Sequence, residues 1–344
     1  MTSPVLVTGG AGFIGCNLAD RLAQEGHDVL VLDALARPGV EQNLRWLQRR
    51  HPGRVSARIA DIRDEDAVAE AVADARAVFH LAGQVAVTTS MTDPRTDFDV
   101  NLRGTFLLLD ALRRRGDAVP LVFASTNKVY GDLQDVRLER HGERYLPADA
   151  ALRESGVGEA RPLDFHTPYG CSKGAADQYV LDFARSFGLP ATVLRMSCIY
   201  GPHQMGTEDQ GWVAHFLIRA LKGEAITVYG DGCQVRDVLH VADAVEAYLR
   251  AWRRIGEVAG RALNLGGGPA NAVSLREVIA HIDALTGRPV TVGYDAWRAG
   301  DQRWYVSDTR AVTQALGLDA PRSWRAGIAD LAAWLGARAS VEAA

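Results

Sequence analysis

The chain has 344 residues, a formal net charge of −4 and a pI near 6.1. Its composition is that of an ordinary globular protein, and the lack of a long run of Lys and Arg argues against a nucleic-acid partner. The amino-terminal sequence lacks a basic segment followed by a signal-length apolar run, and no segment approaches the roughly 18 apolar residues of a membrane span. We therefore expect a cytoplasmic protein that does not associate with membranes.

Six short apolar runs occupy the first 196 residues, and each is followed by a segment with helical periodicity. Apolar runs without strict inside/outside alternation are typical of a parallel sheet covered on both faces. The pattern predicts a doubly wound α/β fold of the Rossmann type. The runs lie at residues 4–8, 28–32, 54–60, 77–82, 119–125 and 190–196.

The pattern changes after about residue 200, which predicts a smaller C-terminal lobe that is partly interleaved with the first. We assign residues 1–199 to a first domain built on the predicted sheet, with a returning segment near 235–252, and residues 200–344 to the second lobe. Residues 132–165 are charged and lack apolar periodicity. We expect them to form an insertion loop near the site, because long irregular stretches in compact domains are usually functional or disordered.

The first apolar run leads into the segment VTGGAGFIG, in which Gly9, Gly12 and Gly15 precede a predicted helix. Glycines at this spacing allow a tight turn and bring a pyrophosphate close to the backbone at the helix amino terminus. A plain strand-to-helix turn is the alternative interpretation. The flanking strand and helix favour a dinucleotide site.

The second run ends at Asp33, about 20 residues beyond the glycine loop. A carboxylate there accepts hydrogen bonds from the adenosine ribose and repels a 2′-phosphate, which favours NAD over NADP, although Arg37 lies nearby in sequence. Asp61 follows the third run. It either borders the adenine together with Ile62, or Asp61 or Asp64 merely caps the next helix.

The segment HTPYGCSKGAADQY places Tyr169 four residues before Lys173, so both side chains share one helix face. Beside a dinucleotide, a lysine ammonium lowers the pKa of the phenol, and the tyrosinate can then take a proton from a sugar hydroxyl. Lys173 is one of three lysines in the sequence. Ser125 and Thr126 end the fifth run, at the sheet edge where such folds bind ligands, and we predict that Thr126 shares the proton in flight.

These motifs resemble the extended short-chain dehydrogenase/reductase family, which contains the nucleotide-sugar epimerases and dehydratases, and the resemblance covers nearly the whole chain. It implies NAD as cofactor and a homodimer formed through helices near 97–115 and 168–187. Its catalytic residues would be Thr126, Tyr169 and Lys173. Its cofactor contacts would be Gly9, Gly12, Phe13, Ile14, Asp33, Asp61, Ile62, Leu81, Ala82, Gln84, Asn101, Ser125, Tyr169 and Lys173.

The resemblance also implies a nucleotide-diphosphate sugar as ligand of the second lobe. Arg236 in QVRDVLHVADA and Arg298 in RAGDQRWY resemble the family's diphosphate-gripping arginines, whose planar forks match phosphate oxygens. Cys198 stands where most members carry an asparagine, so that particular contact is not carried over. The expected substrate-binding residues are Thr88, Thr126, Asn127, Cys198, Arg236 and Arg298, and no metal site is predicted because the cysteines lack ligand spacing.

Five segments resemble most the family members that epimerise CDP-sugars at C2 through a transient keto-sugar. Asn127-Lys128 stands where dehydratases carry an Asp-Glu pair, which argues against dehydration. A UDP-sugar 4-epimerase and an NAD-binding sensor without turnover are the alternatives. The segments are QNLRWL, QVAVTTS, STNKVYGDL, DFHTPYGCSKGAADQY and DQGWV.

Overall fold

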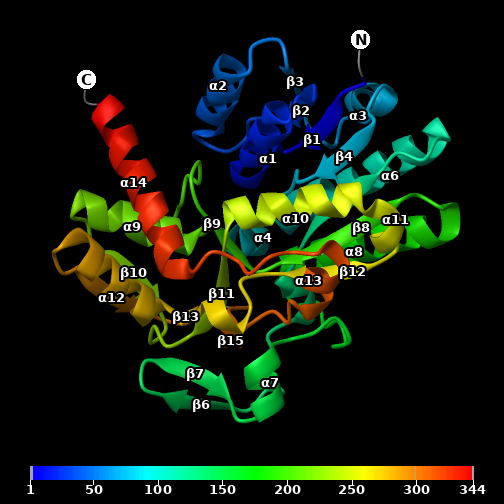
Figure 1. The fold of residues 1–344 in the computed structure, drawn as a ribbon. Coiled ribbons are helices and arrows are strands. Elements are labelled where there is room, and N and C mark those ends of the chain that lie inside the picture. The colour runs from blue at the N-terminus through cyan, green and yellow to red at the C-terminus, as the bar shows by residue number, and fades with distance from the viewer. Residues whose placement is uncertain (1–2, 299, 343–344) are drawn as a thin grey trace.

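A parallel β-sheet forms the centre of the computed structural model, which describes residues 3–298 and 300–342 (Figure 1). Within those residues the strand order is β12-β8-β5-β4-β1-β2-β3, and every pairing is parallel. The predicted doubly wound fold is confirmed. The strands are β1 (Val5–Thr8), β2 (Val29–Asp33), β3 (Val55–Ile59), β4 (Ala77–His80), β5 (Leu121–Thr126), β8 (Ala191–Met196) and β12 (Ala262–Leu265).

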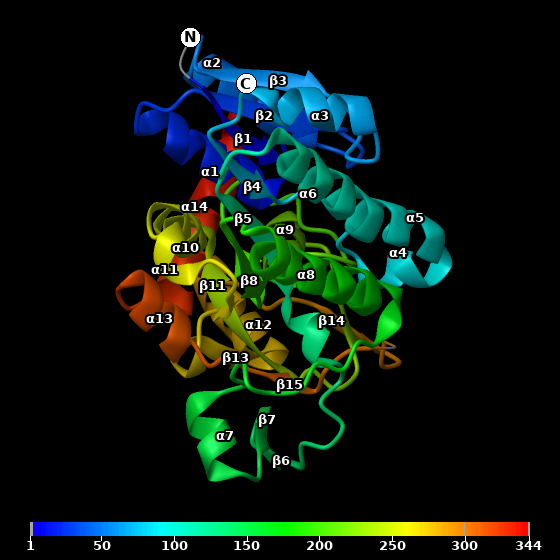
Figure 2. The same cartoon turned by 90° about the vertical axis from the view of Figure 1, so that its right-hand side faces the viewer.

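Helices cover both faces of this sheet (Figure 2). Leu18, Leu22 and Tyr248 belong to the core on one face, while Leu108 and Val180 belong to the core on the other. The first face carries α1 (Phe13–Gln24), α2 (Val40–Arg50), α10 (Val241–Arg253), α11 (Ile255–Val258) and α13 (Arg310–Leu316), and the second carries α3 (Glu65–Ala73), α6 (Gly104–Arg115) and α8 (Thr167–Phe187).

The chain returns to this sheet after it has entered the second lobe. Helix α10 packs against α1, and β12 then pairs in parallel with β8 at the edge of the sheet. Sequence analysis did not identify β12, because its four residues, ALNL, are too few to show a period. The division of the chain at residue 199 remains a prediction, and its outer ends, residues 1–2 and 343–344, lie outside the described residues.

The second lobe has its own hydrophobic core, in which Phe216, Leu217, Ile282 and Trp324 are buried. Strand β11 (Val235–His240) is at the centre of a separate four-stranded sheet, in which it pairs with β9 (Cys198–Tyr200), β13 (Ala272–Ser274) and β15 (Trp304–Tyr305). The other elements are α9 (Trp212–Lys222), β10 (Ile226–Tyr229), α12 (Leu275–Thr286), β14 (Val292–Asp295) and α14 (Trp324–Glu342).

The expectation that residues 132–165 form an irregular loop is wrong. They contain the hairpin β6 (Leu138–His141) and β7 (Arg144–Pro147) and the helix α7 (Ala150–Ser155), which protrude at the bottom of Figure 1. Strand β6 is mostly exposed and β7 is mostly half-buried, so neither strand has a fully buried face that would require apolar alternation. In the ranges that the structure describes, no helix is both long and apolar enough to cross a membrane.

Candidate active site

The glycine loop between β1 and α1 lies against the end of β4. Gly9 has φ +70°, and a Cβ there would stand 2.7 Å from the backbone nitrogen of Ala82. A Cβ at Gly15 would stand 2.2 Å from the carbonyl oxygen of Gly9, so a side chain has no room there either. Gly12 is the N-cap of α1 and leaves its first turn without a side-chain cap. A helix amino terminus in this state is suited to bind a pyrophosphate.

Asp33 is fixed at the end of β2 beside the glycine loop. Its Oδ2 accepts a hydrogen bond from the Ala11 backbone N–H at 3.0 Å, and its Oδ1 accepts one from Leu35 N–H at 2.8 Å. Burial raises the pKa of this carboxyl group, while these backbone donors act in the opposite direction. A carboxylate can accept about four hydrogen bonds, which leaves capacity for the predicted ribose hydroxyls.

Asp61 and Asp64 have different roles at the end of β3. The Oδ1 of Asp64 accepts from the Ala67 backbone N–H at 3.1 Å and caps α3. Asp61 instead forms a bidentate pair with Arg63, with distances of 2.9 and 2.6 Å, and this pairing lowers the pKa of Asp61. Ile62 is buried against Gly104 at the start of α6. The helix-cap alternative therefore holds for Asp64 and not for Asp61.

Asn101 belongs to a buried hydrogen-bond network beside the end of β4. It lies in a π-helical turn (Asp99–Arg103) between α5 (Pro94–Phe98) and α6, accepts from Gln84 N–H at 2.9 Å, and donates to Ser172 Oγ at 3.1 Å. Ser172 donates in turn to Asp97 Oδ2 at 2.5 Å. Asp97 and Ser172 were not predicted, because their proximity depends on how α5 packs against α8.

Tyr169 and Lys173 are buried on α8, one turn apart. The ammonium nitrogen of Lys173 lies 4.4 Å from the centre of the Phe123 ring, and burial lowers the pKa of this lysine to about 8. Burial also raises the pKa of Tyr169 to about 12, while a hydrogen bond with Thr126 lowers it and the charge of Asp97 raises it. Lys173 is not among these influences, so the expected lowering of the phenol pKa by its ammonium is not seen in this structure.

Ser125 and Thr126 are anchored differently although they are adjacent on β5. The hydroxyl of Ser125 donates to Asp177 Oδ2 at 2.8 Å, and Asp177 also receives two hydrogen bonds of 2.9 Å from Arg195 on β8. This buried ion pair joins β5, α8 and β8. Thr126 Oγ1 accepts from the Lys128 backbone N–H at 3.2 Å, and Thr126 hydrogen-bonds to Tyr169. The Asp177–Arg195 ion pair, which holds Ser125, thereby fixes the end of β5 that places Thr126 next to the Tyr169 phenol.

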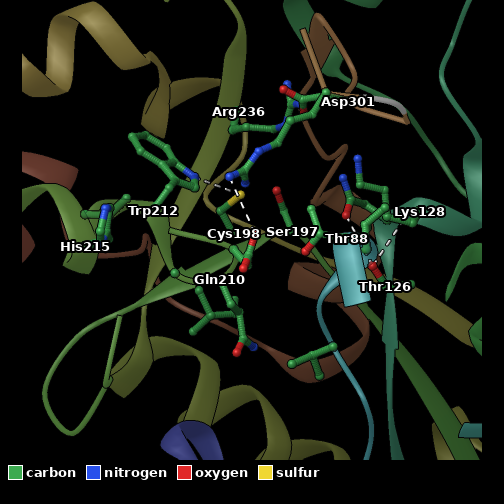
Figure 3. Close-up of a pocket in the computed structure, with 18 of the residues that line it drawn as sticks. Thr88, Thr126, Lys128, Ser197, Cys198, Gln210, Trp212, His215, Arg236 and Asp301 are labelled. Carbon is green, nitrogen blue, oxygen red and sulfur yellow. Dashed lines mark hydrogen bonds and ion pairs between the residues drawn. The ribbon is translucent and has the colours of Figure 1, made fainter. Parts of the chain in front are cut away.

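A cavity of about 380 Å³ opens in front of Tyr169 and Thr126 and extends into the second lobe (Figure 3). Both lobes line it, with a polar floor at the sheet edge and an aromatic wall that includes Trp212 and Tyr229. Lys173, Asp33 and Asn101 lie outside this lining, along the sheet edge. The predicted residues that line the cavity are Phe13, Ile14, Thr88, Ser125, Thr126, Asn127, Tyr169, Cys198, Arg236 and Arg298.

The two predicted phosphate-binding arginines already have acidic partners. Arg236 is buried, and its Nη2 lies 2.6 Å from Asp301 Oδ1. Arg298 stacks on Tyr229, with its guanidinium carbon 3.7 Å from the ring centre, and it lies 3.5 Å from carboxylate oxygens of both Glu208 and Asp209. Both guanidinium groups border the cavity. A phosphate would therefore compete with these carboxylates or share the arginines with them.

Several polar groups of the cavity lack an internal partner. Within residues 3–298 and 300–342, the Thr88 hydroxyl and the amide oxygens of Gln204 and Gln234 are buried without a hydrogen-bond partner. Buried polar atoms are normally satisfied, so these are candidate ligand contacts. Sequence analysis identified Thr88 but missed both glutamines. Asn127, also predicted, uses its amide to donate to Gln302 at 3.0 Å.

Cys198 lies in the cavity wall as a thiol. Its sulfur accepts a hydrogen bond from the Trp212 indole at 3.5 Å, and burial raises its pKa. A thiol with a raised pKa is a poor nucleophile. The position therefore offers a small, weakly polar surface to a ligand.

The comparisons with known proteins agree with this geometry. The family model described as "NAD dependent epimerase/dehydratase family" matches residues 5–266. The chain belongs to this family. It is 39% identical to CDP-paratose 2-epimerase of Salmonella typhi over 96% of this chain and 98% of that protein. It is 32% identical to the putative UDP-glucose 4-epimerase of Methanocaldococcus jannaschii, with 96% and 98% covered.

A solved structure extends the comparison to three dimensions. The UDP-glucose 4-epimerase of Thermus thermophilus, in complex with NAD, has a TM-score of 0.81 and 32% identity, and the match covers 97% of this chain and 99% of that one. The protein is therefore an NAD-dependent epimerase, which is an isomerase, and the predicted cofactor is confirmed. The side-chain-free loop at Gly9 and Gly15 and the carboxylate of Asp33 fit this cofactor.

Proposed function

We propose that this enzyme epimerises a CDP-sugar at C2 by transient oxidation, as in the conversion of CDP-paratose to CDP-tyvelose. The observation that carries the proposal is the 39% identity to CDP-paratose 2-epimerase along almost the whole of both chains. The segment STNKVYGDL, which contributes Thr126, Asn127 and Lys128 to the cavity, supports it locally. The roles of individual residues given below are part of the proposal.

Tyr169 is the proposed proton acceptor for the C2 hydroxyl. Its phenol hydrogen-bonds to Thr126, whose hydroxyl can hold the sugar oxygen in line with Tyr169. Bound NAD supplies the hydride acceptor in the oxidation and the hydride donor in the return step. The sugar ring of the resulting keto intermediate rotates within the cavity and is reduced on its other face, so no net oxidation occurs.

The charge of Lys173 would help Tyr169 to act as a base. Burial raises the pKa of Tyr169 to about 12, so the isolated site holds a neutral phenol. The ammonium of Lys173 would favour the phenolate, and Lys173 would also hold the nicotinamide ribose of the bound cofactor.

The nucleotide diphosphate would lie between Arg236 and Arg298. This grip would keep the neutral keto-sugar attached while its ring turns, which uses binding energy from a part of the substrate that does not react. Gln204 and Gln234, whose amide oxygens lack partners within the described chain, would accept hydrogen bonds from the same ligand. Cys198 would leave space beside the sugar where a larger amide would fill it.

A UDP-sugar 4-epimerase is the second candidate, because a relative with that name matches at 32% identity. It would use the same Tyr169 and Thr126 with a different carbon facing the nicotinamide. A 4,6-dehydratase is disfavoured because Asn127 and Lys128 cannot replace an acidic pair. The sensor alternative is set aside because the chain matches relatives that are named as enzymes over 98% of their length.

Proton NMR of the purified protein, without added cofactor, tests the proposal. We would incubate it separately with CDP-paratose, CDP-glucose and UDP-glucose. A new anomeric signal with manno-type coupling from a CDP-sugar is the expected result. A galacto-type product from UDP-glucose would instead assign the enzyme to 4-epimerisation, and no product even with NAD⁺ supplied would reject both.

We also propose that the enzyme is a homodimer joined through α6 and α8. Phe106, Tyr179 and Phe187 are 40%, 44% and 55% exposed on these helices, and Phe106 meets Tyr179 edge to face. An apolar face of this kind is suited to pack against a second copy. Sedimentation should show a dimer that Phe106→Glu converts to a monomer. A monomeric wild-type protein would contradict the proposal.

The cytoplasm is the proposed location. The four cysteines are free in the structure and are spread over both lobes, which suits a reducing compartment. Cell fractionation against marker enzymes would test this assignment.

A further inference from the structure

Lys128 lines the cavity but has no role in the mechanism above. It lies on the 3₁₀ turn η2 (Asn127–Tyr130), where its backbone N–H donates to Thr126 Oγ1 at 3.2 Å. Its ammonium group donates to the carbonyl oxygen of Gly300 at 2.9 Å. The side chain therefore extends from the proposed catalytic threonine to the loop that carries Asp301, as Figure 3 shows.

The ammonium group of Lys128 forms no ion pair with any carboxylate among the residues that the structure describes. Arg236 faces it from β11, Asp301 from the neighbouring loop, Cys198 from β9 and Asp132 from the segment after η2. Burial lowers the pKa of Lys128 to about 8, and Arg236 acts in the same direction. Asp301 is already paired with Arg236 at 2.6 Å. Arg236 and Lys128 thus lie near each other, and the one carboxylate that is in an ion pair with either of them within the described chain, Asp301, is paired with Arg236. An anion bound there would relieve the repulsion between the two cations.

The ammonium group also has donors to spare. A lysine carries three N–H donors, and in the described ranges its hydrogen bond is to Gly300 O. A phosphate oxygen is a suitable acceptor for the others, because charge-assisted hydrogen bonds are the strong ones. Lys128 is thus a third candidate phosphate contact in the cavity, besides Arg236 and Arg298. It lies only two residues after Thr126 in the sequence.

The chemistry of a nucleotide sugar links this position to the carbon that reacts. The diphosphate is attached through oxygen to C1, so C2 is the next ring carbon, whereas C4 lies across the ring. When C2 faces Tyr169 and Thr126, the β-phosphate must lie beside this catalytic pair. When C4 faces them, the phosphate lies on the far side of the sugar. The ammonium of Lys128 lies on a side chain that begins two residues after Thr126 and lines the same cavity, so it favours the first orientation.

We propose that Lys128 binds the β-phosphate of the substrate and thereby presents C2 rather than C4 to Tyr169. Lys128 is then a specificity-determining residue that contacts substrate. The inference rests on the proposed function, since it assumes a nucleotide-diphosphate sugar that reacts at C2.

Calorimetric titration of the NAD-loaded protein with CDP and with CMP tests the contact without turnover. Lys128→Met keeps the side-chain length and removes the charge, so it should weaken CDP binding by about 30-fold. Binding of CMP, which lacks the β-phosphate, should change by less than about threefold. Lys222→Met, at the exposed end of α9, is the matched control and should bind both nucleotides like the wild type. Equal CDP affinity in Lys128→Met and wild type would overturn the inference.

A pH series separates a phosphate contact from a structural effect on the loop at Gly300. The wild-type affinity for CDP should fall as pH rises through about 8, because the ammonium of Lys128 loses its proton. Lys128→Arg should bind CDP without this fall, since a guanidinium stays protonated. A fall that persists in Lys128→Arg would reject the assignment. The arginine variant also keeps the test valid if Lys128→Met does not fold.

Turnover distinguishes failure of this inference from failure of the proposed function. In Lys128→Met, kcat/KM for C2 epimerisation should fall by about 100-fold, whereas any 4-epimerisation of UDP-glucose should not fall. Unchanged C2 turnover in the variant would overturn the role of Lys128 and leave the function standing. A wild-type protein with no C2 activity on any CDP-sugar would overturn the proposed function itself.

Discussion

The two sides of the active site differ in how their polar residues are held. At the sheet edge, Asp33, Asn101 and Ser125 each have fixed hydrogen bonds to backbone or buried neighbours. On the side of the second lobe, Arg236 and Arg298 are paired with nearby carboxylates. We infer that the cofactor side is preformed, whereas substrate binding requires the arginines to exchange or share partners. Hydride transfer and substrate capture should therefore respond differently to substitution.

Replacement of Tyr169 by phenylalanine should have the largest effect and should act on the sheet-edge side alone. Loss of the phenol removes general acid–base catalysis, so kcat should fall by about 1,000-fold. Release of bound NAD on denaturation should give the same amount as for the wild type. Tyr294→Phe, at an exposed tyrosine of β14, is the control and should be fully active. A Tyr169→Phe enzyme with more than a tenth of wild-type kcat would remove Tyr169 from the mechanism.

The buried ion pair of Asp177 and Arg195, which lies on the sheet-edge side of the site, should contribute to the stability of the fold. Asp177→Asn leaves a buried guanidinium without its counter-ion, and the free energy of unfolding should drop by about 3 kcal/mol. Urea denaturation followed by circular dichroism measures this. Asp182→Asn removes an exposed pair with Arg185 on the same helix and should give no measurable change. Equal midpoints for the two variants would contradict the assignment of a structural role to this pair.

On the side of the second lobe, Arg236→Met should impair substrate capture and leave the chemistry intact. We expect kcat/KM to fall by about 30-fold, mainly through KM, because charge-assisted hydrogen bonds to phosphate are lost. The NAD content should stay at the wild-type level. Arg325→Met is a matched exposed control. If kcat fell as much as kcat/KM, Arg236 would act in the chemical step and the two sides would not be separable.

The smallest effect is expected at His166, the N-cap residue of α8. Hydrogen bonding to Asp132 raises the pKa of His166, and Asp164 acts in the same direction. The resulting stabilisation is fully present below the unfolded pKa of about 6.5 and is lost as pH rises through the higher folded value. His166→Asn should therefore cost about 0.5 kcal/mol at pH 6 and almost nothing at pH 9, since the site is partly exposed. Thermal unfolding at both pH values measures this, and a pH-independent loss would refute it.

Much of the cofactor side could be predicted because its residues follow strands in sequence. Gly9, Asp33 and Thr126 each lie at or just after the carboxyl end of a parallel strand, and those ends meet at one edge. Tyr169 and Lys173 are brought together by helical spacing alone. Local patterns therefore sufficed to place this side of the site.

The remaining features depend on contacts between distant segments. Asp97 and Ser172 meet because α5 packs on α8, and Asp301 reaches Arg236 from 65 positions away. The dominant influence on the pKa of Tyr169 is burial, which the spacing of Tyr169 and Lys173 does not reveal. Strand β12 escaped detection because four residues carry no periodic signal.

The late return of the chain to the sheet determines how this protein can be divided. A fragment that stops at residue 199 would lose β12 and α10, although it contains every predicted catalytic residue. The backbone groups of β8 that pair with β12 would then be unpaired at an apolar margin, where β strands of other molecules can add. Such a truncated protein should aggregate during expression. The two lobes therefore cannot be exchanged between relatives by a single crossover at that boundary, and a chimera needs a second junction after β12.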